Sequence, residues 1–181
     1  MNRIIDSHHN LWDPCSRQYP WIVSALEPIN RPFGMKYLRP ELAANGVVST
    51  IRVQTVSSQS EKVGFLDIAA GAIEVAGVVG WVDLSAVDVA STIQWFLDSV
   101  AGTKLVGIRH QVHDDPYPSW LLNANSQRGI GAVGDAGLVY ELLVRPRELP
   151  AALETVLSHR SMHFVIDHLG KPNIGSGEID T

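Results

Sequence analysis

The chain has 181 residues, of which 45% are hydrophobic and 18% are charged, and its formal net charge at pH 7 is −5. This length and composition predict one globular domain with a sizeable core rather than a disordered chain. Lysines and arginines are scattered along the sequence, which argues against binding to nucleic acid or to an anionic membrane surface.

The single cysteine, Cys15, excludes an internal disulfide and a zinc site built from cysteines. The first residues lack the apolar run of a signal peptide, and no stretch is long and apolar enough to span a membrane. We therefore expect a cytoplasmic protein whose partner is a small molecule. The sequence leaves open whether the chain forms a homo-oligomer.

The first predicted strand, at about 2–6, leads directly into a polar stretch that contains two histidines. Because side chains alternate across a strand, we expect Asp6, His8 and Asn10 to converge on one face. The aromatic residues of the long loop at 14–40 favour an ordered lid or pocket wall. A short helix at 40–44 is predicted to end at Asn45-Gly46.

From residue 47 onward, predicted strands alternate with predicted helices. The strands are at 47–56, 77–84, 105–112, 138–144 and 162–168, because these runs are apolar or β-branched. Helical patterns lie at about 59–73, from 85 to 100, around 119–135 and from Pro146 onward. We expect the apolar stripe of the helix after residue 85 to include Val89, Ile93 and Phe96, and that of the last helix to consist of Leu149, Leu153, Val156 and Leu157.

This alternation predicts right-handed βαβ units and a parallel sheet, either open or closed into a barrel. No glycine-rich phosphate loop follows the first strand, which argues against a nucleotide-binding sheet. Polar residues gather at the carboxyl ends of several strands, which favours the barrel. They are His8, His9, Asn10, Gln54, Asp83, Arg109, His110, His113, Asp167 and His168. We predict an α/β fold, a TIM-type (β/α) barrel with six strands, over residues 1–181.

Three segments together resemble the amidohydrolase superfamily: Ile5-Asp-Ser-His-His-Asn-Leu-Trp-Asp-Pro14, Val106-Gly-Ile-Arg-His110 and Phe164-Val-Ile-Asp-His-Leu-Gly-Lys-Pro172. The resemblance is to its amidohydrolase-related branch, which contains L-fuconolactonase-like and 2-pyrone-4,6-dicarboxylate lactonase-like hydrolases. That branch has a complete (β/α)8 barrel. Because this branch contains lactonases, the resemblance implies a hydrolase that opens a lactone or related cyclic ester of a sugar acid or carboxylate. It also implies that strands seven and eight are missing and that the chain is a fragment of a longer product.

The resemblance also implies roles for single residues. His8 and His168 match the histidines of strands one and six, as catalytic groups or as ligands of a divalent metal such as zinc. Asn10, the third catalytic candidate, stands where the family has a second histidine, and the strand-eight aspartate is absent. We expect Arg109, with His110 and Trp12, to bind the substrate, with Arg109 contacting an anionic group. The residues also allow a mechanism without a cofactor.

Asn10 and the missing strands lead us to expect impaired catalysis in this chain. Two alternatives to the lactone hydrolase stay open. One is a non-catalytic barrel remnant that binds a small carboxylate or a partner protein. The other is a decarboxylase of the same superfamily.

Overall fold

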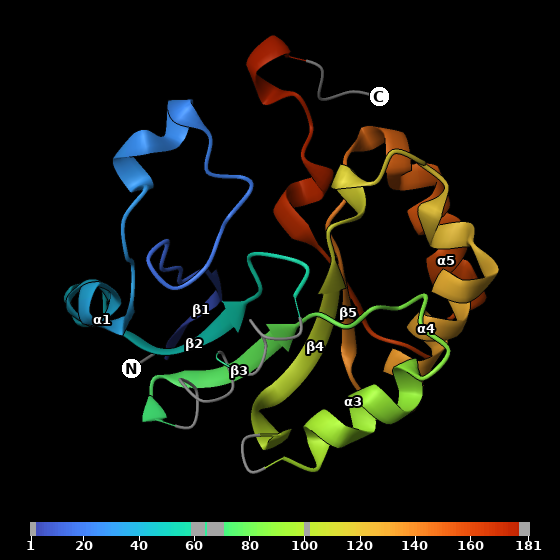
Figure 1. The fold of residues 1–181 in the computed structure, drawn as a ribbon, viewed down its shortest axis with the longest axis horizontal. Helices are drawn as coiled ribbons and strands as arrows, with labels where there is room; N and C mark the ends of the chain where they lie inside the picture. The colour runs from blue at the N-terminus through green and yellow to red at the C-terminus, as the bar shows by residue number, and fades with distance from the viewer. Residues whose placement is uncertain (1–2, 59–63, 65–70, 100–101, 178–181) are drawn as a thin grey trace.

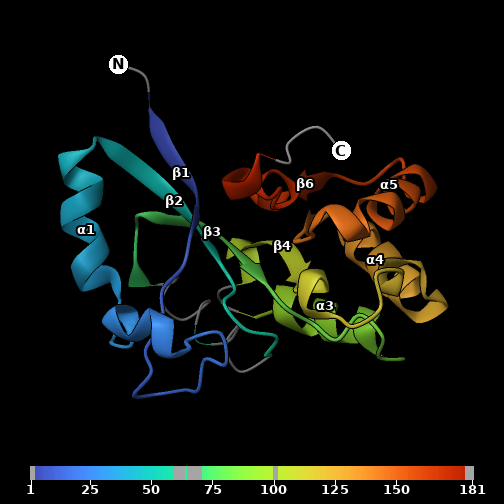
Figure 2. The same ribbon diagram turned by 90° about the horizontal axis from the view of Figure 1, so that it is seen from above.

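Six parallel strands form one curled sheet in the computed structural model, which describes residues 3–58, 64, 71–99 and 102–177. Each strand pairs with its neighbours in chain order, so the sheet is a partial barrel (Figures 1 and 2). This confirms the predicted barrel-type α/β fold with six strands. The strands are β1 (Ile4–His9), β2 (Val47–Val53), β3 (Val75–Gly80), β4 (Leu105–His110), β5 (Val139–Leu142) and β6 (Phe164–Ile166).

Helices lie on the outer side of the curled sheet (Figure 2). They are α1 (Met35–Ala44), α3 (Val89–Leu97), α4 (Ala124–Asp135) and α5 (Leu149–Ser158). The predicted start of the first helix at Pro40 was wrong, because α1 begins at Met35 and contains Pro40 in its interior. The predicted helix at 59–73 falls mostly outside the described residues. Short 3-10 helices occupy Ser24–Ile29, Gly102–Lys104, Val112–Asp114, Trp120–Leu122, Pro146–Glu148, Asp167–Gly170 and Ile174–Ser176.

The hydrophobic core lies between the sheet and the helices α3 and α4. Ile93 and Phe96 of α3 and Ile130 of α4 belong to the same buried cluster as Ile108 and Tyr140 of the sheet. The predicted buried stripe of α3 is thereby confirmed, since its 3.6-residue spacing places Val89, Ile93 and Phe96 on the face that contacts the strands. No helix in the described part of the chain is both long enough and apolar enough to cross a bilayer.

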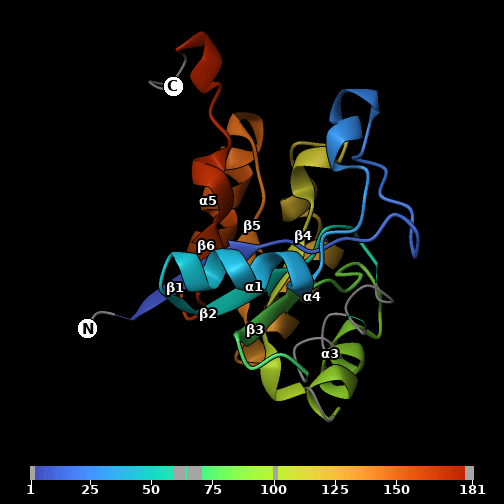
Figure 3. The same cartoon turned by 90° about the vertical axis from the view of Figure 1, so that its left-hand side faces the viewer.

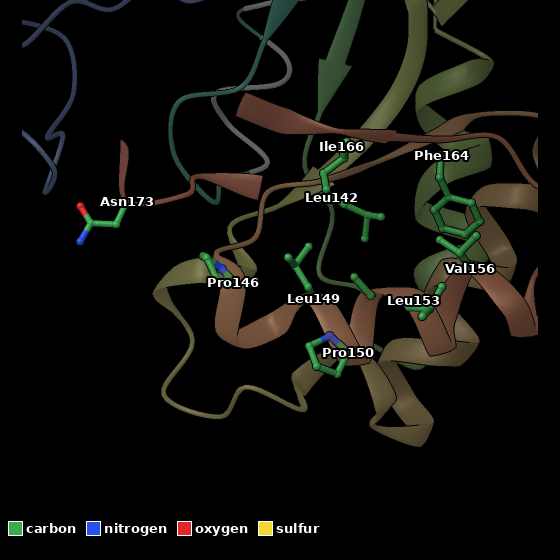
Figure 4. A pocket seen from close by; sticks show the side chains of 10 residues that line it. Leu142, Pro146, Leu149, Pro150, Leu153, Val156, Phe164, Ile166 and Asn173 are labelled. Atoms are coloured by element: carbon green, nitrogen blue, oxygen red, sulfur yellow. The ribbon is translucent and has the colours of Figure 1, made fainter. Parts of the chain in front are cut away.

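Helix α5 buries a different face from the one that its leucines predict. Ala151, Ala152 and Thr155 are buried, whereas Leu153 is 61% exposed and Leu157 is 49% exposed. The small residues allow α5 to approach the core closely, and Leu149, Leu153 and Val156 line a groove of about 970 Å³ between α5 and β6. Figure 4 shows Leu149, Leu153 and Val156 of α5 and Phe164 and Ile166 of β6 around this groove.

The two edges of the sheet are β1 and β6. Ile5 in β1 is 56% exposed and Ile166 in β6 is 47% exposed, although both have the apolar character of barrel residues. Exposed apolar edges of this kind are what six strands of a barrel predict. Figures 1 and 3 show that the loop after β1 and the segment after β6 both extend on the side where β4 ends, which places them around the candidate site.

Candidate active site

Polar side chains from β1, β4 and the segment after β6 meet at the carboxyl end of the sheet. Arg109 Nη1 donates a hydrogen bond to Asp167 Oδ2 at 2.6 Å and lies 3.4 Å from His8 Nε2. His8 Nδ1 is 3.5 Å from Asp167 Oδ1, and the rings of His8 and His168 have centroids 4.9 Å apart. The structure thus brings together Arg109 and the two predicted histidines, with Asp167 between Arg109 and His8.

The alternation expected for β1 is interrupted just before the site. Between Asp6 and His9 the pairing of β1 with β2 shifts register, so the strand contains a bulge. A bulge adds one residue and changes which side chains share a face. Asp6 consequently lies near His9, with Oδ2 3.9 Å from His9 Nδ1, and the predicted convergence of the Asp6 and His8 side chains was wrong.

Asp167 is the buried anion of the site. It is 3% exposed, and Arg109 beside it is also 3% exposed. Burial raises the pKa of Asp167, but the hydrogen bonds from His8 and Arg109 outweigh this effect and hold it below its ordinary value. Arg109 Nη2 donates to the backbone oxygen of Gln54. Arg109 is therefore held between two protein acceptors, and Asp167 stays ionised at neutral pH.

His168 lies in an unusual turn. His168, Leu169, Gly170 and Lys171 have φ values of 51°, 56°, 73° and 50°, all in the left-handed region. For residues other than glycine this conformation costs roughly 1–2 kcal/mol each, and such strain is found most often at functional sites. Burial, with further contributions from His8, Lys171 and Arg109, lowers the pKa of His168, so its imidazole is neutral at pH 7.

Above these groups lies a cavity of about 470 Å³ that opens between the loop after β1 and the ends of β4, β5 and β6. Asn10 and Trp12 line it together with Arg109 and His168. Trp12 is fixed by a hydrogen bond from its Nε1 to the backbone oxygen of Ile29 and by contact with two further aromatic rings. Trp21, in the loop at 14–40, contacts Trp12 and also lines the cavity, so this loop provides part of a pocket wall, as its aromatic content predicts.

His110 lies away from this cavity. Its ring stacks on Trp120, with centroids 4.0 Å apart, and its Nδ1 accepts a hydrogen bond from Trp81 Nε1 at 3.0 Å. Burial lowers the pKa of His110 to about 4. Adjacent residues of a strand face opposite sides, so Arg109 faces the site and His110 the helices. His110 thus packs against Trp81 and Trp120 in this structure, and its contact with a substrate stays a prediction.

Sequence reasoning missed two groups, Glu141 and Lys171. Glu141 in β5 pairs with Arg109 in β4, is 6% exposed and lines an inner cavity of about 480 Å³ with His8 and Asp167. Lys171 lines the outer cavity beside His168. The parallel register of the two strands, once known, points to Glu141, because paired residues face the same side of a sheet.

Comparison with known proteins shows the family. The family model for amidohydrolases matches residues 5–180 of the chain. The chain belongs to the amidohydrolase family. It is 36% identical over 173 residues to an L-fucono-1,5-lactonase of Burkholderia ambifaria, with 96% of this chain and 59% of that protein covered. It is 32% identical over 178 residues to an L-fucono-1,5-lactonase of Burkholderia multivorans, with 97% and 58% covered.

Solved amidohydrolase structures share the fold. A Burkholderia multivorans amidohydrolase with bound zinc matches with a TM-score of 0.87 and 31% identity, covering 94% of this chain and 59% of that one. A structure of a Burkholderia multivorans amidohydrolase with bound HEPES matches with a TM-score of 0.90 and 30% identity, covering 99% and 61%. The chain therefore spans somewhat less than two thirds of the length of these relatives.

Among the described residues, His8, Asp167 and His168 form a possible set of metal ligands, since their donor atoms lie within 4.8 Å of one another. Imidazole and carboxylate donors of this kind suit zinc. However, Arg109 Nη1 is 2.6 Å from Asp167 Oδ2 and 3.4 Å from His8 Nε2, so a fixed cation already contacts two of the three ligands. A divalent ion would have to displace it. The donor set as arranged here does not fit a metal ion.

Proposed function

We propose that this chain has the chemistry of a lactone hydrolase and opens a lactone or related cyclic ester to a hydroxy acid. The observation that supports this most strongly is the convergence of His8, Arg109 and His168 around Asp167 where the parallel strands end. This edge is where (β/α) barrels have their active sites. The similarity to L-fucono-1,5-lactonases supports the same reaction class.

Hydrolysis requires a group that activates water and groups that stabilise negative charge on the carbonyl oxygen. His168 is the base in this proposal, because its imidazole is neutral at pH 7 and borders the cavity. The Asn10 amide, which lines the same cavity, supplies N–H donors to the carbonyl oxygen, and Arg109 acts on the site through Asp167 and His168. Asp167 accepts a hydrogen bond from His8 and thereby orients the ring that packs against His168.

In the reaction, a water molecule loses a proton to His168 while its oxygen adds to the carbonyl carbon. The ring C–O bond then breaks, and His168 returns the proton to the departing alkoxide oxygen. The products are a carboxylate and a hydroxyl on one open chain, with one proton released to solvent. We further propose that turnover is impaired relative to the longer relatives. Asn10 stands where the family has a second histidine, and an amide side chain cannot act as a base.

A panel of sugar-acid lactones, assayed with the 181-residue chain and a pH indicator, tests this proposal. We expect His168→Ala to lower kcat/KM at least roughly 100-fold, which is the usual contribution of a general base. His163→Ala is the matched control, because His163 is exposed and does not line the candidate cavity. Equal turnover in His168→Ala and in the unaltered chain would contradict the assignment. Release of carbon dioxide from a carboxylated substrate without ring opening would favour the decarboxylase instead.

A further inference from the structure

The outer cavity contains more positive than negative charge. Arg109, Arg145 and Lys171 line it, whereas Asp114 is the one carboxylate among the described residues that do so. Arg109 is already neutralised by Asp167 below the cavity floor. Arg145 lies 3.9 Å from Asp114, from Nη2 to Oδ1. One positive charge is therefore left over, and it belongs to Lys171.

Lys171 has one polar side-chain contact but no salt bridge to a carboxylate of the described residues. Its Nζ is 3.3 Å from His113 Nε2, and no salt bridge to a described carboxylate is formed. Burial, with the charges of Arg145 and Arg109, lowers the pKa of Lys171 against the opposing effects of Asp114 and Asp167. Burial together with Lys171 lowers the pKa of His113. His113 is thus neutral at pH 7, and its Nε2 either accepts a hydrogen bond from Lys171 Nζ or, in the other tautomer, donates one to Asp114 Oδ1 at 3.2 Å. An ammonium group with only an imidazole partner has spare capacity for an anion.

The backbone fixes Lys171 next to the reacting group. Lys171 and His168 are the two ends of the left-handed turn, and both line the outer cavity. Leu169, inside the turn, is 81% exposed, so burial of its side chain does not explain the strained conformation. Strain that persists without a packing reason indicates a positional requirement. The turn places the ammonium group of Lys171 and the imidazole of His168 in the lining of the same cavity.

We propose that Lys171, supported by Arg145 and His113, binds a carboxylate of the substrate, so that the substrate is a lactone that bears one free carboxylate. This inference rests on the proposed lactone hydrolase function and names its substrate class. It assigns to Lys171 the anchoring role that we predicted for Arg109 from the sequence, because Nη1 and Nη2 of Arg109 both donate to protein acceptors. A single excess charge matches a carboxylate better than a doubly charged phosphate.

Binding of stable analogues tests the inference separately from catalysis. The probes are cyclopentanone and 3-oxocyclopentane-1-carboxylate, titrated into the 181-residue chain and followed by NMR. We expect the carboxylated ketone to bind at least about tenfold more tightly, as for one charge-assisted hydrogen bond. Lys171→Met should abolish this preference, and Lys171→Arg should keep most of it. Lys36→Met, which removes an exposed lysine of α1, should leave it unchanged.

Kinetics provide the second measurement. The substrates are γ-butyrolactone and γ-butyrolactone that bears one carboxylate. In Lys171→Met, kcat/KM for the carboxylated lactone, divided by kcat/KM for the plain lactone, should fall about tenfold. If lactones are hydrolysed but neither preference depends on Lys171, the subsite is wrong and the hydrolase function stands. If no lactone is hydrolysed but the binding preference depends on Lys171, the subsite stands and the hydrolase function fails. If Lys171→Met does not fold, Lys171→Gln replaces it, with Lys171→Arg as the folded reference. Loss of the carboxylate preference in Lys171→Gln supports the subsite, and retention of the preference contradicts it.

Discussion

Glu141 provides a sharp test of the electrostatics of the site, through the substitution Glu141→Gln. Its side chain is 6% exposed, and Oε2 has no hydrogen-bond partner among the described residues. Burial, with the negative charge of Asp167, raises the pKa of Glu141 from 4.5 to about 7, against the opposing effects of Arg109 and His8. Glutamine has the same shape as the protonated side chain, so the substitution removes the titration and keeps the packing.

The sign of the effect follows from the direction of the shift. In the unfolded chain Glu141 loses its proton near its ordinary pKa of 4.5, whereas in the folded chain it keeps the proton up to about pH 7. The folded state therefore loses stability, relative to Glu141→Gln, as the pH rises from 4.5 to 7, and the difference is constant above that. A shift of this size corresponds to about 3 kcal/mol. For a chain of this length, that is roughly 6–12 °C in melting temperature.

Thermal melts followed by circular dichroism between pH 4.5 and 8.5 measure the effect. Glu141→Gln should melt at nearly the same temperature as the unaltered chain at the acidic end and several degrees higher at the alkaline end. His9 and His110 have pKa values lowered to about 4 by burial, and they increase the stability of both proteins as the pH rises to 6.5. Their contribution cancels in the difference. Glu154→Gln, an exposed position on α5, is the control. A difference between the two proteins that does not change with pH would refute the reasoning.

Two further predictions concern Arg109. Arg109→Met leaves Asp167 ionised and buried with the His8 imidazole but without its charged partner, so we expect a loss of about 3–5 kcal/mol in the free energy of unfolding, measured by chemical denaturation. Arg39→Met, which breaks an exposed pair with Glu74, should change the denaturation midpoint little, and similar losses in both variants would argue against the buried pair. Zinc should not raise the melting temperature of the unaltered chain, because Arg109 contacts two of the three possible ligands, but it should raise that of Arg109→Met. A zinc-dependent rise in the unaltered chain that His168→Ala removes would show that the ion displaces the guanidinium.

The order of the strands could be predicted because each buried strand is an apolar run and each connection is a helical pattern. The face of α5 could not be predicted in the same way. Leu149, Leu153 and Val156 have the spacing of a buried stripe, yet Leu153 is 61% exposed and Leu149 and Val156 are only partly buried against the core. The fully buried residues of the helix are Ala151, Ala152 and Thr155. Hydrophobic periodicity identifies an apolar face, but it does not distinguish the face that packs in this chain from one that faces an open groove. In α5 the apolar residues cover more than one side, so the choice depends on the neighbouring elements.

The candidate site also combines residues that the sequence identifies with backbone conformations that it does not predict. His8, Arg109 and His168 were identifiable because they belong to sequence patterns, and the parallel sheet then brings the ends of their strands together. Neither the bulge in β1 nor the left-handed turn at His168 has such a pattern, since three of the four residues of the turn are not glycine. The bulge separates Asp6 from His8, and the turn brings Lys171 to the cavity.

Arg109 illustrates the consequence. From the sequence, an arginine at a strand end is available to a substrate. In the structure its two terminal nitrogens are committed to Asp167 and Gln54, and the position also excludes a metal ion from the adjacent donors as they are arranged. The same guanidinium thus lowers the pKa of Asp167 and contributes to the neutral state of His168. Its effect on the site is exerted through these two neighbours. We therefore assign the recognition of an anionic substrate to Lys171, the cation among the described residues of the cavity that has no such commitments.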